Sequence, residues 1–419
     1  MIKGSLKDRM TFTFPDEWEI RTLSDITTDI IDNRGKTPPL DKDGKYPLLE
    51  IFNMQEDSLN LITQEKQKYV NEEVYQTWFR NGHPSHGDIL ISTVGNVGIV
   101  SYYDKENASI AQNIVALRLN RDKAHSKFLA YYLSSVQFEK WIKGVTMHAV
   151  QPSLKVPHLL EGPVPLPLLR EQQKIASILS SVDEIISKTE DIIEQTNQIK
   201  SGVMRKLFKE GIRNSDFKET KLGKIPYDWE IVRQGDIAKF YNGRAFKEKE
   251  FIDEGTPVVR IQNLKGGKNF VYSNLELEKN KYIDKGDLIY AWSATFGPYI
   301  WEGNKAIYHY HIWKIEPSEN ILKKYFYYKL HSLSDDNTSH KKGAVFAHLT
   351  KSFMESYEIA LPPLKEQQEI VDTLESIDNK ISSDLFTLNK LKLIKEGLMQ
   401  QLLTGKVRVP LNENEEVPQ

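Results

Sequence analysis

At 419 residues the chain is longer than one ordinary folding unit, and its 39% hydrophobic and 27% charged residues are typical of a folded globular protein. It has no cysteine, which excludes disulfides, thiolate zinc sites and cysteine nucleophiles. The formal net charge of -2 excludes a generically basic protein that coats nucleic acid, so any DNA binding has to use local clusters or a partner's cations. Without a membrane span or a signal peptide, the chain reads as a soluble cytoplasmic protein.

Residues 1–165 are expected to form a β-rich α+β domain. Short strand-like runs, such as GDILIS at 87–92 and NIVALRL at 113–119, are separated by Gly, Asn, Asp and Pro. A helical run, KFLAYYLSSVQFEKWIK, follows at 127–143. The pattern does not predict the fold beyond this class.

Residues 166–214 are expected to form one long helix. Pro165 and Pro167 precede a run rich in Glu, Gln and Lys, as is typical of a helix start, and Gly211 is a plausible end. Spacing of three and four residues continues over four heptads, which indicates a coiled coil. The predicted core positions are Ile175, Ile178, Val182, Ile185, Thr189, Ile192, Thr196, Ile199 and Val203.

The rest of the chain repeats this order. The copies keep their sequence order while the spacing between them shortens, which is typical of a duplicated unit with different loop lengths. The matches are FPDEWEI (14–20) with IPYDWEI (225–231), PLLEIFNM (47–54) with PVVRIQNL (257–264), GDILIS (87–92) with GDLIYA (286–291), and PLPLLREQQKI (165–175) with ALPPLKEQQEI (360–370). We therefore expect a second β-rich domain at 215–360, a second long helix at 361–410 and a disordered tail at 411–419.

The second helix should pack against the first. A helix of about 40 residues is about 60 Å long, so it has to cover its apolar stripe with another element, and the other copy is the simplest partner. A pseudo-two-fold axis would make the pair antiparallel and would hold the two domains a fixed distance apart. The predicted core positions are Ile370, Leu374, Ile377, Ile381, Leu388, Leu391, Leu398 and Leu402, interrupted by Asp384 and Lys395.

Signatures of catalysis are missing from the sequence. It contains no phosphate-binding loop ending in Gly-Lys-Ser/Thr, no GxGxxG motif, and no Asp/Asn-Pro-Pro-aromatic tetrapeptide of the kind adenine methyltransferases use. His309 and His311 could approach a metal from one strand face, but strand packing or nucleic-acid contact is favoured, and His83 with His86 is judged the same way. We predict no catalytic residue and no metal site.

The repeated EQQ phrase before a long helix, with GDLIYAWSATFGPYIWEGNKAIYHYHIW and KKGAVFAHLTKSFMESYEIALPPLKEQQ in the second half, closely resembles the specificity subunits of type I restriction-modification systems. HGDILISTVGNVGIVSYYDKENASIAQNIVALRLN looks like another variety of the same recognition domain. The resemblance covers essentially the whole chain.

This resemblance implies two target recognition domains, each reading one half of an asymmetric bipartite DNA site, with the helix pair setting the unread gap. It implies double-stranded DNA, modification subunits (usually two) and restriction subunits as partners, with S-adenosylmethionine, ATP and Mg on those partners and no cofactor on this chain. The alternatives are a methylation-only or type IIB-like system, an enzyme with a diverged site, and a coiled-coil scaffold without a DNA role.

Candidate DNA contacts are polar or basic residues in predicted loops. In the first domain they are Arg34, Lys36, Asn96, Gln112, Asn113 and Lys143. In the second they are Arg244, Lys247, Asn263, Lys265, Lys268, Lys341 and Lys342. Which bases are read does not follow from the sequence, because readout depends on side-chain placement in the grooves.

A separate group at the helix starts is expected to mark the junction of each helix with its domain. It comprises Glu171, Gln172 and Gln173 with their copies Glu366, Gln367 and Gln368. Helix initiation by acidic and amide side chains is one interpretation. Docking against the chain's own recognition domain or against a modification subunit is the other, and the repeated Gln pair favours it.

Overall fold

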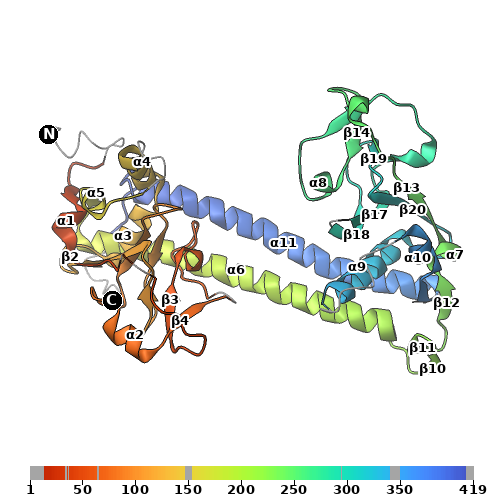
Figure 1. Ribbon diagram of the computed structural model, residues 1–419, viewed down its shortest axis with the longest axis horizontal. Coiled ribbons are helices and arrows are strands. Elements are labelled where there is room, and N and C mark those ends of the chain that lie inside the picture. The colour runs from red at the N-terminus through yellow and green to blue at the C-terminus, as the bar shows by residue number, and fades with distance from the viewer. Residues whose placement is uncertain are drawn as a thin grey trace. The chain divides into compact units, whose positions relative to one another are not determined.

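The computed structural model describes residues 14–33, 35, 37–63, 66–146, 153–293, 295–339 and 350–411. The chain forms two compact units, one made of the residues up to 190 together with those from 386 onward, and the other of residues 191–385 (Figure 1). Each unit contains a β-rich domain and a part of both long helices. Arg34, Lys36, Lys341, Lys342 and the tail from 412 lie outside the described residues.

The main sheet of the first unit has four antiparallel strands in the order β2-β8-β5-β6. A second sheet, β4-β3-β7, pairs β3 with β7 in parallel, and β1 pairs with β9. The strands are β1 Glu19–Thr22, β2 Thr27–Ile31, β3 Tyr46–Leu49, β4 Lys68–Val70, β5 Ile89–Ser92, β6 Val100–Tyr102, β7 Ser109–Ile110, β8 Ile114–Leu119 and β9 Pro163–Leu166. The short helices are α1 Leu23–Ile26, α2 Glu72–Thr77, α3 Ser126–Leu133, α4 Val136–Thr146 and α5 Val156–Leu160.

The second unit repeats this scheme. Its main sheet runs β13-β20-β17-β18, and a second sheet, β15-β14-β19-β16, again contains one parallel pair, β14 with β19. The strands are β10 Phe217–Thr220, β11 Gly223–Pro226, β12 Glu230–Arg233, β13 Ala238–Asn242, β14 Thr256–Val259, β15 Val271–Ser273, β16 Tyr282–Ile283, β17 Leu288–Ser293, β18 Thr295–Ile300, β19 Ala306–Tyr308, β20 Ile312–Pro317 and β21 Glu358–Leu361. The short helices are α7 Gln234–Ile237, α8 Ile261–Leu264, α9 Lys323–Ser339 and α10 Lys351–Ser356.

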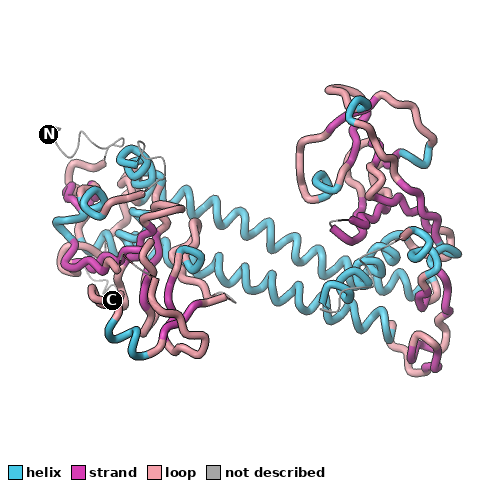
Figure 2. The backbone as a smooth tube through the Cα atoms, in the orientation of Figure 1, coloured by secondary structure: helices cyan, strands magenta, loops and turns pink. Residues whose placement is uncertain are grey.

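Two long helices, α6 (Leu169–Glu210, 42 residues) and α11 (Leu364–Leu402, 39 residues), complete both units. In the first unit the start of α6 shares a hydrophobic core with the end of α11, through Ile175 and Leu402. In the second unit the end of α6 shares a core with the start of α11, through Leu207 and Ile370. The helices therefore pack antiparallel within each unit. The strands all belong to the β-rich domains, as Figure 2 shows for the described residues.

The expected fold class, α+β with two β-rich domains and two packed long helices, is confirmed by these observations. The predicted core positions of the second helix are also correct, since all of them are buried or half-buried in α11. In α6, Ile175 is buried and Val182 and Val203 are half-buried.

Three predicted core positions of the first helix are wrong. Ile185, Ile192 and Ile199 are 50%, 46% and 60% exposed. The residues one position further on face inward instead, because Ile186 is buried and Ile193 and Lys200 are half-buried. The heptad spacing is right, but these three core positions lie one residue later than predicted.

Candidate nucleic-acid interface and helix junctions

The start of α6 is held against the first β-rich domain by two buried side chains. Gln172 accepts a hydrogen bond from His125 N at 2.8 Å and donates one to Pro167 O at 2.9 Å. The carboxylate of Glu171 accepts from Arg408 Nε and Nη2 at 2.7 and 2.8 Å. Because Arg408 follows α11, this buried carboxylate joins the start of one long helix to the segment after the other.

The start of α11 is held in the same way in the second unit. Gln367 is buried, its Oε1 accepts from Leu322 N at 2.8 Å, and its Nε2 donates to Asn320 O at 3.0 Å and Pro362 O at 2.9 Å. The amide therefore links the helix start to the segment before α9, as Gln172 links α6 to the segment before α3.

Glu366 accepts three hydrogen bonds from the segment that follows α6. The donors are Ile212 N, Asn214 Nδ2 and Trp229 Nε1, each at 2.7 Å. The two junctions are thus equivalent, although an arginine supplies the donors to Glu171 and a backbone amide, a side-chain amide and an indole supply them to Glu366.

The EQQ phrase therefore joins each helix to its own β-rich domain, in agreement with one of the two docking alternatives. The last glutamine of each copy is placed differently. Gln173 is only half-buried, and Gln368 is exposed and donates to Asp372 Oδ1 at 2.7 Å. Docking of another subunit at Gln173 or Gln368 stays a prediction.

Each unit also contains a chain of three polar side chains that links a domain to both long helices. In the first unit Tyr131 of α3 donates to Asp183 Oδ2 at 2.7 Å, and Lys395 of α11 lies 2.7 Å from Asp183 Oδ1. In the second unit Tyr328 of α9 donates to Asp378 Oδ2 at 2.5 Å, and Lys200 of α6 lies 2.5 Å from Asp378 Oδ1. We call these the first and second Tyr-Asp-Lys chains.

The candidate DNA contacts of the first domain lie close together in part. Asn96 is exposed in the β5–β6 turn, where its amide donates to Glu56 Oε1 at 2.7 Å. Gln112 is exposed and Asn113 half-buried in the turn before β8, and Thr93 N donates to Asn113 O at 2.8 Å across the strands. Lys143 is exposed in α4.

Candidates of the second domain are more scattered. Lys247, Lys265 and Lys268 are exposed. The guanidinium of Arg244 is held by Glu250, at 3.1 and 2.6 Å, and this pairing lowers the pKa of Glu250 to about 2. A cation held this closely to a carboxylate is a weaker phosphate ligand than the exposed lysines, since binding a phosphate would compete with Glu250.

Asn263 is not available for DNA contact. Its side chain is buried, its Oδ1 accepts from Arg260 N at 2.9 Å, and its Nδ2 donates to Gly267 O and Asn269 O, both at 3.1 Å. The amide shapes the α8 loop, so this prediction is corrected to a structural role.

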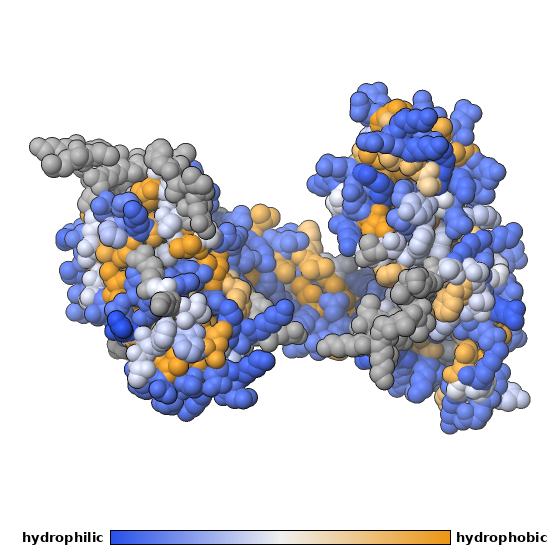
Figure 3. Space-filling model, in the orientation of Figure 1, coloured by the Kyte–Doolittle hydropathy of each residue, from blue (hydrophilic) through white to orange (hydrophobic). Residues whose placement is uncertain are grey.

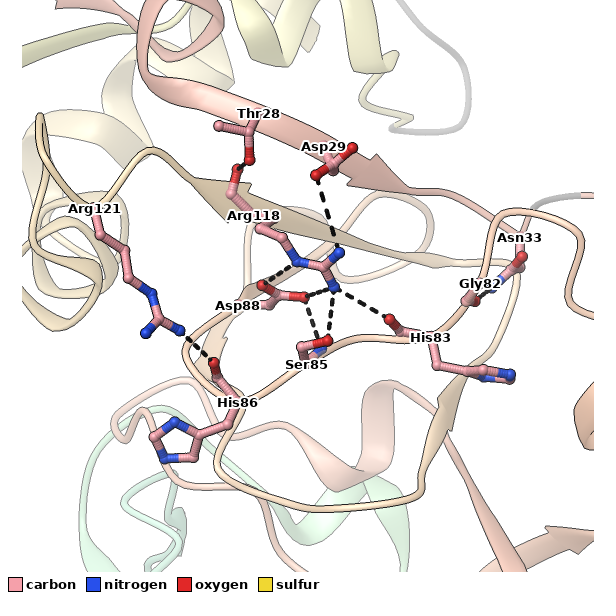
Figure 4. A network of polar contacts seen from close by, with 10 residues as sticks. All are labelled: Thr28, Asp29, Asn33, Gly82, His83, Ser85, His86, Asp88, Arg118 and Arg121. Atoms are coloured by element: carbon pink, nitrogen blue, oxygen red, sulfur yellow. Dashed lines mark hydrogen bonds and ion pairs between the residues drawn. The ribbon is translucent and has the colours of Figure 1, made fainter.

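A polar network in the first domain fixes the turn that enters β5 (Figure 4). Arg118 of β8 donates to both carboxylate oxygens of Asp88, at 3.2 and 2.9 Å, and to Ser85 Oγ at 2.9 Å. The Asp88 bonds raise the pKa of Arg118. In the second unit Lys314 of β20 pairs with Asp287 at 2.9 Å, at the equivalent turn. Both units therefore hold this turn with an ion pair between a cationic residue and an aspartate. The ion pair belongs to the repeated framework and does not restrict the side chains at the other ends of the strands.

His309 and His311 lie in the turn between β19 and β20 and not on one strand face as expected, whereas His83 lies in local contacts. His83 lies between Ser109 Oγ at 3.2 Å and Tyr75 O at 3.0 Å, and burial lowers its pKa. His309 and His311 face each other with ring centroids 5.0 Å apart. In the parts of the chain that the structure describes, no three His, Cys, Asp or Glu side chains form a possible metal site.

One group that the sequence did not point to lies beside Arg244. Trp292, Phe296 and Tyr310 are half-buried or exposed aromatic residues at one end of the main sheet of the second domain. The sequence signal that could have found them is the correspondence of AQNI (111–114) with HYHI (309–312), which aligns Tyr310 with the candidate Gln112. None of the helices in the described ranges is long and apolar enough to cross a membrane.

The chain belongs to the family described as type I restriction modification DNA specificity domain, which matches residues 15–198 and 226–393. It is therefore, as predicted, the non-catalytic DNA specificity subunit of a type I restriction-modification system. In this class of subunit no cofactor is carried by the specificity chain itself.

The similar proteins match nearly full length. The chain is 31% identical over 409 residues to the putative type I restriction enzyme MjaX specificity subunit of Methanocaldococcus jannaschii, covering 94% of this chain and 95% of that protein. It is 27% identical over 428 residues to the MjaVIII specificity subunit of the same organism, covering 97% and 96%.

Two solved structures share the fold. A chain of the structure described as "Structural basis underlying complex assembly and conformational transition of the type I R-M system" matches with a TM-score of 0.61 at 16% identity, over 94% of this chain and 100% of that one. The type I restriction-modification S subunit of M. genitalium matches with a TM-score of 0.53 at 18% identity, over 92% and 96%.

Proposed function

We propose that the chain reads an asymmetric bipartite DNA sequence. Residues 1–165 read one half, residues 215–360 read the other, and the helices at 166–214 and 361–410 set the length of the unread gap through an antiparallel, pseudo-two-fold pairing. The observation that carries this proposal is the repeated framework with different exposed side chains. Sheet order and junction contacts recur in both units, whereas the side chains exposed at the strand ends differ.

Modification subunits, two for each specificity subunit, dock on the exposed faces of the long helices. Apolar side chains that are not covered by the antiparallel partner reach the surface there (Figure 3). On α6 they recur at seven-residue steps, at Ile185, Ile192 and Ile199, and α11 adds Phe386 and Leu393. A stripe with this spacing fits the apolar face of a helix from another chain, because heptad repeats pair with heptad repeats.

The partner subunits supply the chemistry. Methyl transfer from S-adenosylmethionine takes place on the modification subunits, and ATP-driven cleavage with Mg takes place on restriction subunits. The near-neutral net charge of this chain fits such an assembly, in which the partner shares the phosphate contacts.

Methylome sequencing of cells with and without the gene for this chain tests the proposal. We expect a bipartite, asymmetric, adenine-methylated motif that disappears when the chain is removed and returns when it is restored. Persistence of every methylated motif would contradict the proposal. The mass of the purified complex tests the expected two modification subunits.

Exchange of residues 1–165 for another recognition domain tests whether the two halves are read independently. One half of the methylated motif should change and the other half should stay. A change in both halves would show that the domains do not read separately.

A further inference from the structure

The turn before β8 in the first unit and the turn before β20 in the second unit share their backbone hydrogen bonds. Three bonds match one for one, which aligns Gln112 with Tyr310 and Asn113 with His311. In the first unit the bonds are Ala111 N to Leu49 O (2.8 Å), Ile114 N to Ala111 O (3.1 Å) and Thr93 N to Asn113 O (2.8 Å). In the second unit their equivalents, in the same order, are His309 N to Val259 O (2.9 Å), Ile312 N to His309 O (2.9 Å) and Trp292 N to His311 O (3.1 Å).

In the first unit this position carries amide side chains. Gln112 is exposed and Asn113 is half-buried, and the adjoining β5–β6 turn adds the exposed Asn96, whose backbone oxygen accepts from Ser92 Oγ. We call Asn96, Gln112 and Asn113 the amide patch. The Nδ2 of Asn96 donates to Glu56 Oε1 at 2.7 Å and the Oδ1 of Asn113 is buried, so the exposed Gln112 is the amide best placed to donate and accept toward a base.

In the second unit the same position carries rings. Tyr310 is 40% and Phe296 42% exposed, and Phe296 lies opposite Trp292 in the β17–β18 register. The ring of Trp292 lies 6.1 Å from that of Tyr310 and 5.3 Å from that of His311. We call Trp292, Phe296, Tyr310 and His311 the aromatic patch.

The shared turn does not require exposed rings at the aromatic patch. Tyr310 and Phe296 leave apolar surface in water, and the equivalent position of the first unit shows that the turn forms with amides instead. The backbone of the two turns is the same, but their exposed side chains differ. This is expected of a position that gives each of two DNA-reading surfaces its own specificity.

We propose that the two patches read bases, the amide patch an adenine in the first half-site and the aromatic patch the methyl group of a thymine in the second. Asn and Gln pair with the N6 and N7 edge of adenine in the major groove, whereas apolar and aromatic side chains contact the thymine C5-methyl group. This inference rests on the proposed function and names the base-reading residues for it.

Cations flank both patches. Arg244 N donates to Tyr308 O at 3.1 Å and Tyr310 N donates to Arg244 O at 3.0 Å, so the segment that leads to the exposed Lys247 lies beside the aromatic patch. In the first unit Ile142 of α4 lies against Gly98, so α4 lies beside the β5–β6 turn, and the exposed Lys143 of α4 is ion-paired with Glu139. Phosphate contacts of this kind orient a duplex without selecting its sequence.

The first test uses the wild-type complex of the full chain with its modification subunits. Binding is measured to duplexes of the methylated motif in which one thymine at a time in the second half-site is replaced by uracil, which lacks the methyl group. We expect one replacement to weaken binding roughly five- to hundredfold. In the first half-site, 7-deazaadenine, which lacks the N7 acceptor, should act in the same way at one adenine.

The second test uses variants in cells, with the motif read by methylome sequencing. Phe296→Ala with Tyr310→Ala should make the motif accept other bases at one thymine position of the second half-site. Gln112→Ala should make the motif accept other bases at one adenine position of the first half-site. Tyr227→Ala is the matched control, because Tyr227 is an exposed aromatic residue beside the β10–β11 hairpin and should leave the motif unchanged.

The outcomes separate this inference from the proposed function. If the wild-type chain directs methylation of a bipartite motif but tolerates uracil at every second-half thymine, the aromatic patch does not read thymine and the inference is wrong. If the wild-type chain directs no bipartite motif, the proposed function fails and the inference fails with it. The uracil measurement needs no variant, so a misfolded variant cannot obscure the result.

Discussion

Lys395 Nζ of α11 lies 2.7 Å from Asp183 Oδ1 of α6, and the two side chains are only 11% and 14% exposed. This pair is the helix-to-helix link of the first Tyr-Asp-Lys chain. A buried ion pair contributes less to stability than to specificity, since desolvation offsets much of the attraction, but removal of one partner leaves a buried charge. We therefore expect the pair to favour one alignment of the two helices over others.

Asp183→Ala should destabilise the full chain by about 3 kcal/mol, whereas Asp183→Leu combined with Lys395→Leu should cost far less. Urea unfolding of the purified chain measures both. Glu184→Gln with Lys188→Gln is the control, because this exposed i,i+4 pair on the same helix should contribute under about 1 kcal/mol. Equal losses of unfolding free energy from the single alanine substitution and from the double leucine substitution would contradict the expectation.

The tyrosines of the two chains predict a loss of stability in alkali. Burial, together with the carboxylate of Asp183, raises the pKa of Tyr131 above its ordinary 10.0, and burial with Asp378 does the same for Tyr328. The unfolded chain ionises near pH 10 while the folded chain does not, so this stability is present below pH 10 and is lost as the pH rises above it.

Tyr131→Phe with Tyr328→Phe should flatten that loss. Each tyrosine contributes at most about 1.4 kcal/mol per pH unit to the slope of the unfolding free energy above pH 10. The measurement is urea unfolding of both proteins at pH 8 to 11. Parallel curves would show that these two tyrosines do not titrate differently on folding.

The two glutamines of the second junction should differ sharply when truncated. Gln367 is buried with three hydrogen bonds, and Gln367→Ala should cost about 2 to 3 kcal/mol because it leaves Leu322 N, Asn320 O and Pro362 O without their partner. Gln368 is exposed, and Gln368→Ala should change stability by less than about 0.5 kcal/mol. Thermal unfolding of the full chain compares them, and similar melting temperatures would contradict the junction role.

The sequence predicted the long helices but not the face that α6 turns inward. Isoleucines occur in adjacent pairs, 185 with 186 and 192 with 193, so two heptad frames are apolar there, and at the third position Lys200 faces inward although Ile199 is apolar. Adjacent residues are 100° apart on a helix, and only packing against α11 selects between the frames. α11 offered no such ambiguity at Leu374 and Ile377, and its core positions were predicted correctly.

Site residues were harder to predict than elements because a residue type does not reveal its contacts. Asn263 looked like an exposed loop amide, yet its copy Asn53 and Asn263 itself are buried and hold their own turns. The repeated EQQ phrase was informative because duplication separated the buried glutamines from chance. Tyr310 was missed because aromatic residues in a strand-like run also fit a core.

Matched insertions in the two long helices should lengthen the unread gap. One heptad adds about 10.5 Å to an α-helix, which equals about three base pairs of DNA, so seven residues inserted in both α6 and α11 should favour sites with a longer gap. The insertion points are the exposed residues after Glu190 in α6 and after Leu385 in α11. Methylome sequencing reads the result as unchanged half-sites at a larger separation.

An insertion in only one helix is the control. With seven residues added to one helix only, the pair Asp183–Lys395 and the pair Lys200–Asp378 cannot both keep their partners. Methylation of any bipartite site should then be lost and the melting temperature should fall. If matched insertions instead leave the gap unchanged while methylation continues, the helices do not set the gap.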